Sequence, residues 1–268
     1  MLVNSWRRIT SELKSISYDV KHKKDFLAQL PKLRQLKNCQ KGNRCFILGN
    51  GPSLKSQDFL LLKDEFTFVT NHFIHHEQLW DFNPTYYCAS DANFFLPKIN
   101  QEWQSKFASL PESTKLFFSY RASKKIVESV PLSQFDSYLL RYHPKKIWEY
   151  SKFQSNIENF LYSGDTVIID FCIPLAIYMG FTDIYLMGVD CNYNINNSGT
   201  IDYAFSSKDV TTRRSSDQHL QGQWLNNVFS SYQTVKNAKL VNIYDATEGG
   251  NLNVFPKVKF ENIIESIL

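Results

Sequence analysis

The sequence is poor in the residues that mark disulfide scaffolds, fibres and disordered chains. Its 268 residues include only 10 Gly, 9 Pro and 5 Cys. The low Gly and Pro content excludes a collagen-like or low-complexity chain. Because the cysteine count is odd and no C-x-x-C pair occurs, we expect neither a disulfide framework nor a thiolate zinc site. A reducing cytosol is the compartment that this cysteine usage predicts.

Long apolar runs are absent as well. The longest, residues 167–179, is about two-thirds of a membrane span and contains Asp170 and Pro174. We interpret it as a buried helix. Residues 1–6 (MLVNSW) are too short for the apolar core of a signal peptide, so none is expected.

Positive charge is concentrated at the amino-terminal end. Residues 1–44 contain 11 Lys/Arg and 3 Asp/Glu, a net charge of +8, whereas the whole chain carries 30 minus 26, or +4. The other 224 residues therefore carry −4, and we expect no nucleic-acid partner. For residues 1–40 two interpretations stay open: a solvated helical face, or contact with an anionic membrane surface. The second is favoured by apolar residues at three- and four-residue steps, namely Leu2, Trp6, Ile9, Leu13 and Ile16.

Strand-type and helix-type segments alternate along the rest of the chain. Strands are predicted at 44–48, 66–70, 85–89, 115–119, 138–142, 184–189 and 240–244. Helices are predicted at 1–38 with a break near Pro31, from Ser53 onward, and at 166–179, 218–236 and 262–268. This alternation is typical of an α/β, Rossmann-like fold, a mostly parallel sheet with helices on both faces. We expect a basic helical extension at 1–43 and one domain at 44–268, with a polar lid near 192–217.

Ligands of such sheets bind at the carboxyl ends of the strands. There, Gly49-Asn50-Gly51-Pro52-Ser53 follows one strand and opens a predicted helix. Glycines and helix-end N–H groups suit a phosphate, and Asn50 adds an amide for a base or sugar. The alternative is a tight structural turn. The motif is neither the dinucleotide fingerprint nor a P-loop.

Three further segments allow a functional and a structural interpretation. Ser163-Gly164-Asp165 precedes the apolar helix and either caps it or holds part of a nucleotide. Asp190 follows a strand and is either a ligand or base, or a cap for neighbouring backbone. His219 follows the polar loop and is either a surface residue or a proton acceptor near neutral pH. The histidines near residue 75 lack a metal-binding pattern, so no metal site is expected.

Several motifs in order resemble a known family. FILGNGPSLK, Val69-Thr70-Asn71, the 162–165 turn, MGFTDIYLMGVD and Tyr203-Ala204-Phe205 are similar to segments of the bacterial sialyltransferases of glycosyltransferase family 42. They also resemble a related domain family, typified by archaeal 6-hydroxymethylpterin diphosphokinase and flagellin nonulosonic acid transferases. The likeness covers about residues 44–245.

The sialyltransferase resemblance implies a variant GT-A arrangement and metal-independent, inverting transfer of a sialic or related nonulosonic acid from a CMP-activated donor. It implies nucleotide contacts for seven residues: Asn50, Gly51, Ser53, Asn71, Ser163, Gly164 and, less directly, Ser90. Gly49 and Asp190 complete the set of candidate nucleotide-binding residues. Tyr203 and Tyr193 would hold the leaving phosphate. The acceptor would be a glycan or lipid-linked oligosaccharide of surface polysaccharide or lipopolysaccharide synthesis, at the cytoplasmic face of the inner membrane. Members of the family often form homo-oligomers.

The sequence departs from the sialyltransferase pattern at two positions. The family's base is a His directly after a Gly, but here Gln223 follows Gly222, and His219 lies four residues before Gln223. Either His219 is the base, shifted by one helical turn, or the chemistry differs. The second departure is Asp91, which stands where the family has an Asn that contacts the nucleotide. Two alternatives therefore stay open: a diphosphokinase that uses ATP and Mg²⁺, with Asp91 and Asp190 as metal ligands, and a non-catalytic nucleotide-binding protein.

Overall fold

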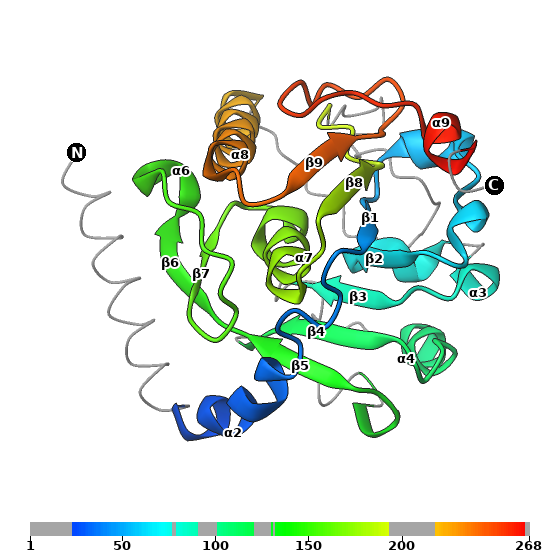
Figure 1. Ribbon diagram of the computed structural model, residues 1–268, viewed down its shortest axis with the longest axis vertical. Helices are drawn as coiled ribbons and strands as arrows, with labels where there is room; N and C mark the ends of the chain where they lie inside the picture. Colours follow the sequence, from blue (N-terminus) through cyan, green and yellow to red (C-terminus); the bar gives the residue numbers. More distant parts are fainter. Residues whose placement is uncertain are drawn as a thin grey trace.

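The central feature is a seven-stranded sheet in which every neighbouring pair of strands is parallel (Figure 1). The structure is a computed structural model that describes residues 23–76, 79–90, 101–120, 130, 132–192 and 218–265. The strands follow the order β5-β4-β3-β2-β1-β8-β9. Their bounds are β1 Arg44–Leu48, β2 Phe66–Thr70, β3 Tyr86–Ala89, β4 Lys115–Ser119, β5 Ser137–Leu140, β8 Asp183–Met187 and β9 Asn242–Asp245. The predicted α/β, Rossmann-like fold is confirmed.

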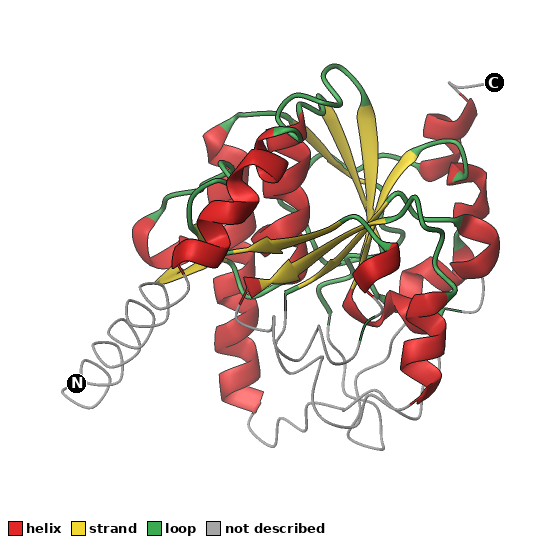
Figure 2. Ribbon diagram, turned by 90° about the horizontal axis from the view of Figure 1, so that it is seen from below, coloured by secondary structure: helices red, strands yellow, loops and turns green. Residues whose placement is uncertain are grey.

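Helices cover both faces of this sheet (Figure 2). The α-helices described are α2 Lys23–Arg34, α3 Leu79–Phe82, α4 Gln101–Ala108, α6 Ile147–Tyr150, α7 Ile173–Met179, α8 Gln218–Ala238 and α9 Phe260–Glu265. Short 3₁₀ turns are η1 Pro52–Ser56, η2 Phe59–Leu62, η3 Asn71–His75 and η6 Leu132–Gln134, and η7 Ile168–Cys172 is a π-helical turn. A separate parallel pair consists of β6 Tyr142–Lys146 and β7 Leu161–Ser163.

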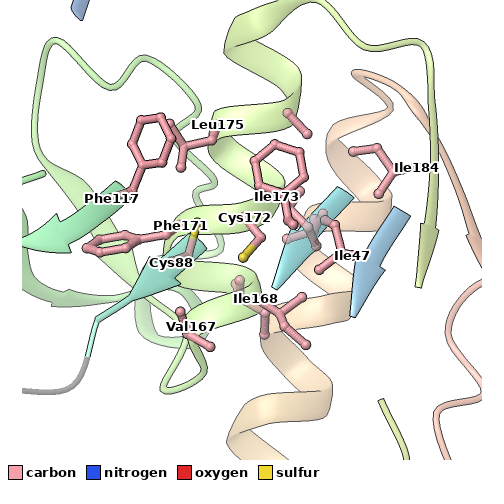
Figure 3. Close-up of a cluster of buried hydrophobic side chains, with 14 of the residues drawn as sticks. Ile47, Cys88, Phe117, Val167, Ile168, Phe171, Cys172, Ile173, Leu175 and Ile184 are labelled. Carbon is pink, nitrogen blue, oxygen red and sulfur yellow. The ribbon is translucent and has the colours of Figure 1, made fainter. Parts of the chain in front are cut away.

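The continuous apolar strands are explained by burial on both faces. Cys45 and Ile47 of β1 belong to the core that includes α7, whereas Phe46 and Leu48 belong to the core on the opposite face. All four side chains are completely buried. Figure 3 shows strand residues of the first core gathered around η7 and α7, with Ile47, Cys88 and Phe117 among those drawn. The segment 167–179 is therefore sandwiched against the sheet, as its uniform hydrophobicity predicts.

Three predicted elements differ from the structure. Pro31 does not break α2, which continues to Arg34 because the helix packs through buried Leu33. Ser53 does not begin a helix: η1 starts after Gly51, and Asp58 starts η2 by accepting a hydrogen bond from Leu60 N.

The strand predicted at 138–142 is divided into β5 and β6 by Arg141. The guanidinium of Arg141 lies 3.4 Å from the ring centre of Phe26 and 4.1 Å from that of Phe160. These two cation–π contacts hold Arg141 at the point where the strand is interrupted.

Helix α2 lies against the edge strand β5 (Figure 1). Lys32 Nζ donates to the Ser137 carbonyl, and Leu139 N donates to Gln29 Oε1, so side chains of α2 cover the open edge. The domain boundary at residue 43 stays a prediction. Residues 1–22 and, apart from Asn192, the predicted lid at 192–217 lie outside the described residues. Within the described residues, no helix is long and apolar enough to cross a membrane.

Candidate functional site

The topology predicts a ligand site at the carboxyl ends of β1 and β8. The chain runs outward from β1 to β5 and then returns to place β8 beside β1, so the strand order reverses between these two strands. A reversal of this kind opens a crevice where ligands of doubly wound sheets bind. Gly49–Ser53 follows β1, Asn71 follows β2, and Gly188–Asp190 follows β8.

The loops after β1 and β8 are joined tightly. Gly49 N donates to the Met187 carbonyl at 2.8 Å, and Gly51 N donates to the Gly188 carbonyl at 2.9 Å. A Cβ on Gly49 would lie 2.3 Å from the Gly188 oxygen, and one on Gly51 would lie 1.8 Å from an Asp190 oxygen. The glycines of this motif are therefore required for contact between the two loops. Their N–H groups are used within the protein.

Asp190 completes the connection between the loops. Its carboxylate accepts from Ser53 N at 3.2 Å and from Ser53 Oγ at 2.7 Å. The residue is only 7% exposed, and this burial raises the pKa of its carboxyl group. The hydrogen bonds from Ser53 oppose the rise, and the neighbouring Asp245 carboxylate adds to it. Asp190 therefore holds the loop after β1 through both the backbone N–H and the hydroxyl of Ser53.

Two amide side chains at the ends of β1 and β2 present unused acceptors. Asn50 Nδ2 donates to the Thr70 carbonyl at 3.0 Å and to Thr70 Oγ1 at 3.2 Å, which fixes the orientation of the amide. The Asn50 and Asn71 Oδ1 atoms are both buried and accept no hydrogen bond. Asn71 also has a positive φ of 41° and accepts a hydrogen bond from the Tyr87 hydroxyl through its carbonyl. A buried acceptor without a donor is costly, so a ligand N–H there would be favourable.

The loop of Ser163, Gly164 and Asp165 lies before the π-turn η7. Gly164 N donates to the carboxylate of Asp170 at 2.6 Å, and Asp170 is 5% exposed. Lys146 Nζ donates to Ser163 Oγ at 3.2 Å and forms an ion pair with Asp165, whose φ is 64°. This loop is thus fixed from two sides.

The first residues of η7 connect that loop to the crevice. A Cβ on Gly49 would lie 3.5 Å from Ile168 Cδ1, and one on Gly164 would lie 2.5 Å from Ile169 Cγ2. Neighbouring residues of η7 therefore pack against Gly49 of the loop after β1 and against Gly164 of the 163–165 loop.

For the other predicted site residues, the structure describes few contacts or none. Ser90 follows β3 and is half-buried. His219 lies in the first turn of α8, but its side chain is outside the described part of the structure. Asp91, Tyr193 and Tyr203 also lie outside it.

His72 and His75 lie on η3, and His76 directly follows it. His75 is buried, and its Nδ1 lies 3.2 Å from Lys106 Nζ. Within the described residues, no group of three or more His, Cys, Asp or Glu side chains is arranged to hold a metal ion.

Sequence reasoning missed three residues that shape the site: Thr70, Lys146 and Asp170. Thr70 orients Asn50, while Lys146 and Asp170 fix the 163–165 loop. Asp170 carried a detectable signal, because a carboxylate inside an otherwise apolar run requires a buried partner. Lys146 carried none, since nothing in the sequence pairs β6 with β7.

The fold is that of a Rossmann-like α/β protein, with the candidate site residues near its topological switch point. Residues 21–196, more than half of the chain, match a family model described as 6-hydroxymethylpterin diphosphokinase MptE-like. The chain belongs to this family. This match agrees with the second of the two likenesses expected from the sequence, whereas the narrower likeness to family 42 sialyltransferases stays a prediction. No curated protein matches the chain.

Proposed function

We propose that the protein is a transferase that uses a CMP-activated nonulosonic acid and transfers the sugar to a glycan acceptor. The observation that carries this proposal is the pair of unused amide oxygens at Asn50 and Asn71. Cytosine has an exocyclic amino group that can donate to them, whereas uracil has a carbonyl at the same position. Since Thr70 takes the amide N–H groups of Asn50, this side chain offers an acceptor and not a donor to the ligand.

The chemistry needs one bond to break and one to form. The bond between the anomeric carbon and the CMP phosphate oxygen breaks, and the acceptor hydroxyl oxygen bonds to the same carbon from the opposite face. His219 takes the hydroxyl proton, and the hydroxyls of Tyr193 and Tyr203 stabilise the charge on the departing phosphate. Residues 192–217 form the lid that excludes water, which would otherwise hydrolyse the donor. The transfer uses no metal, and residues 1–40 contact the membrane surface that carries a lipid-linked acceptor.

The base specificity can be tested by calorimetric titration with CMP and UMP. The wild-type protein should bind CMP more tightly by about 10-fold, the value of one well-placed hydrogen bond. Asn50→Ala should lose most of this preference. Asn43→Ala provides the matched control, because Asn43 is exposed and lies directly before β1, at the opposite end of that strand. Equal binding of CMP and UMP by the wild-type protein would contradict the assignment of the amide oxygens.

The family description favours a second candidate, a diphosphokinase of the pterin type. Such an enzyme would transfer a diphosphate from ATP to a hydroxymethyl group and would need Mg²⁺, with Asp91 and Asp190 as ligands. Adenine also has an exocyclic amino group, so the Asn50 and Asn71 oxygens alone do not separate the two candidates. The Asp190 carboxylate favours the metal-independent transferase, because both of its oxygens already accept hydrogen bonds from Ser53. Hydrolysis of CMP-sialic acid that is insensitive to EDTA would support the transferase, and magnesium-dependent turnover of ATP would support the kinase.

A further inference from the structure

We propose that Lys146 binds the phosphate group of the nucleotide, exchanging its ion pair with Asp165 for the ligand. The inference rests on the proposed function only in taking the ligand to be a nucleotide. Neither the motifs of the sequence nor the family resemblance assigns a role to Lys146.

Lys146 is the last residue of β6 and lies opposite Ser163 of β7. Its ammonium group contacts Ser163 Oγ and Asp165 and lies 5.2 Å from the centre of the Trp148 ring. An ammonium group has three N–H donors. Two oxygen partners therefore leave one donor for a ligand, at the loop that packs beside the crevice.

The carboxylates around the crevice make a cation necessary. Asp190 follows β8, and Asp245 ends the neighbouring strand β9. Asp165 and Asp170 lie in and just after the loop that follows β7. A phosphate brought among these groups would be repelled unless a positive charge offset them. The described lysines paired with these carboxylates are Lys146 and Lys257.

The two lysines differ in how readily their ion pairs can open. Lys257 lies 2.6 Å from an oxygen of Asp245, a completely buried side chain, so removing Lys257 would leave a buried charge unpaired. The partner of Lys146 is different, because the Asp165 side chain is 25% exposed and water can solvate its carboxylate. Both side chains are partly exposed, at 32% for Lys146 and 25% for Asp165, so this ion pair opens at lower cost than the pair of Lys257 with Asp245.

The loop that carries Asp165 need not move during this exchange. Asp170 accepts from Gly164 N, and Ser163 Oγ accepts from Asp165 N at 3.3 Å, so these two contacts with the loop backbone remain when Lys146 turns away. The Lys146 side chain can therefore change rotamer toward a ligand while the 163–165 loop stays in place. On this account Lys146 contributes to phosphate affinity, whereas the base is recognised separately by Asn50 and Asn71.

Lys146→Gln tests the proposal when binding of cytidine and of CMP is measured by calorimetry in the full-length protein. The dissociation constant for CMP should rise about 10- to 100-fold, the range expected when a hydrogen bond to a charged group is lost. The constant for cytidine, which has no phosphate, should change by less than about 2-fold. Lys146→Arg, which keeps the charge, should recover part of the CMP affinity. Lys152→Gln is the matched control, because Lys152 is exposed and lies six residues further along the chain.

The outcomes separate this proposal from the proposed function. Equal loss of cytidine and CMP affinity would show that Lys146 only positions the 163–165 loop and would overturn the proposal, as would unchanged affinity for both. If the wild-type protein binds adenosine and ADP instead, the CMP assignment fails and the same comparison is made with that pair. Failure of the wild-type protein to bind any of these ligands would overturn both proposals.

Discussion

Gly51→Ala is expected to break the connection between the loops after β1 and β8. The backbone of Gly51 has φ −71° and ψ 151°, which alanine adopts easily, so the effect would be purely steric. The added Cβ would lie 1.8 Å from Asp190 Oδ2 and 2.7 Å from the Gly188 carbonyl oxygen. Asp190 would have to move away, and its hydrogen bonds with Ser53 would be lost.

The size of the effect follows from these contacts. A hydrogen bond to a charged group contributes about 1.5–3 kcal/mol, and overpacking costs about 1–3 kcal/mol. We therefore expect a loss of about 3 kcal/mol in the free energy of unfolding. For a chain of this size that corresponds to a fall in melting temperature of about 6–12 °C.

Thermal and urea unfolding of purified variants can measure this loss. Gly222→Ala is the matched control: Gly222 lies on α8, and a Cβ there would meet nothing within 4 Å. Alanine is the better helix former, so the control should be unchanged or stabilised by up to about 1 kcal/mol. Equal melting temperatures for the two variants would refute the role assigned to the contact between the loops.

Three further predictions concern Asp136, the cysteines and His219. Hydrogen bonds from Lys115, Lys32 and Tyr138 outweigh the effect of burial and lower the pKa of Asp136 to about 2. The stability that Asp136 contributes should be fully present above its ordinary pKa of 3.8 and should be lost as the pH falls through about 2. Thermal melts of Asp136→Asn should lack this pH-dependent contribution. Iodoacetamide should label exposed Cys39 in the native protein, as mass spectrometry can show. The buried thiols should react only after unfolding, namely those of Cys45, Cys88, Cys172 and Cys191. His219→Ala should lower the rate of CMP-sugar turnover about 10²- to 10⁴-fold, and full activity would remove His219 as the base.

The strands could be predicted well because their signal is local. The segments 44–48, 66–70 and 115–119 coincide with β1, β2 and β4, since burial on both sheet faces requires an unbroken apolar run. Prediction was poorer where a distant partner decides the local structure. Ser53 has the residue type of a helix cap, yet its hydroxyl bonds to Asp190, which lies 137 residues further along the chain.

The sequence predicts which candidate site residues follow the strands, but it does not predict their contacts. The rule that ligands bind at the carboxyl ends of parallel strands selects Asn50, Asn71 and Asp190 from the sequence. It does not show that the N–H groups of Gly49 and Gly51 are used inside the protein, because this depends on the register between β1 and β8. The role of Lys146 depends in the same way on the pairing of β6 with β7.

The central claim is that the crevice binds a cytidine nucleotide without a metal. It is tested most directly by the melting temperature of the wild-type protein with CMP, CMP-sialic acid, UDP and ATP–Mg²⁺. A ligand at about 100 times its dissociation constant adds about 2.7 kcal/mol, enough to raise the melting temperature by several degrees. We predict a rise with CMP and CMP-sialic acid that EDTA does not change. A rise with ATP–Mg²⁺ alone would contradict the claim and favour the diphosphokinase.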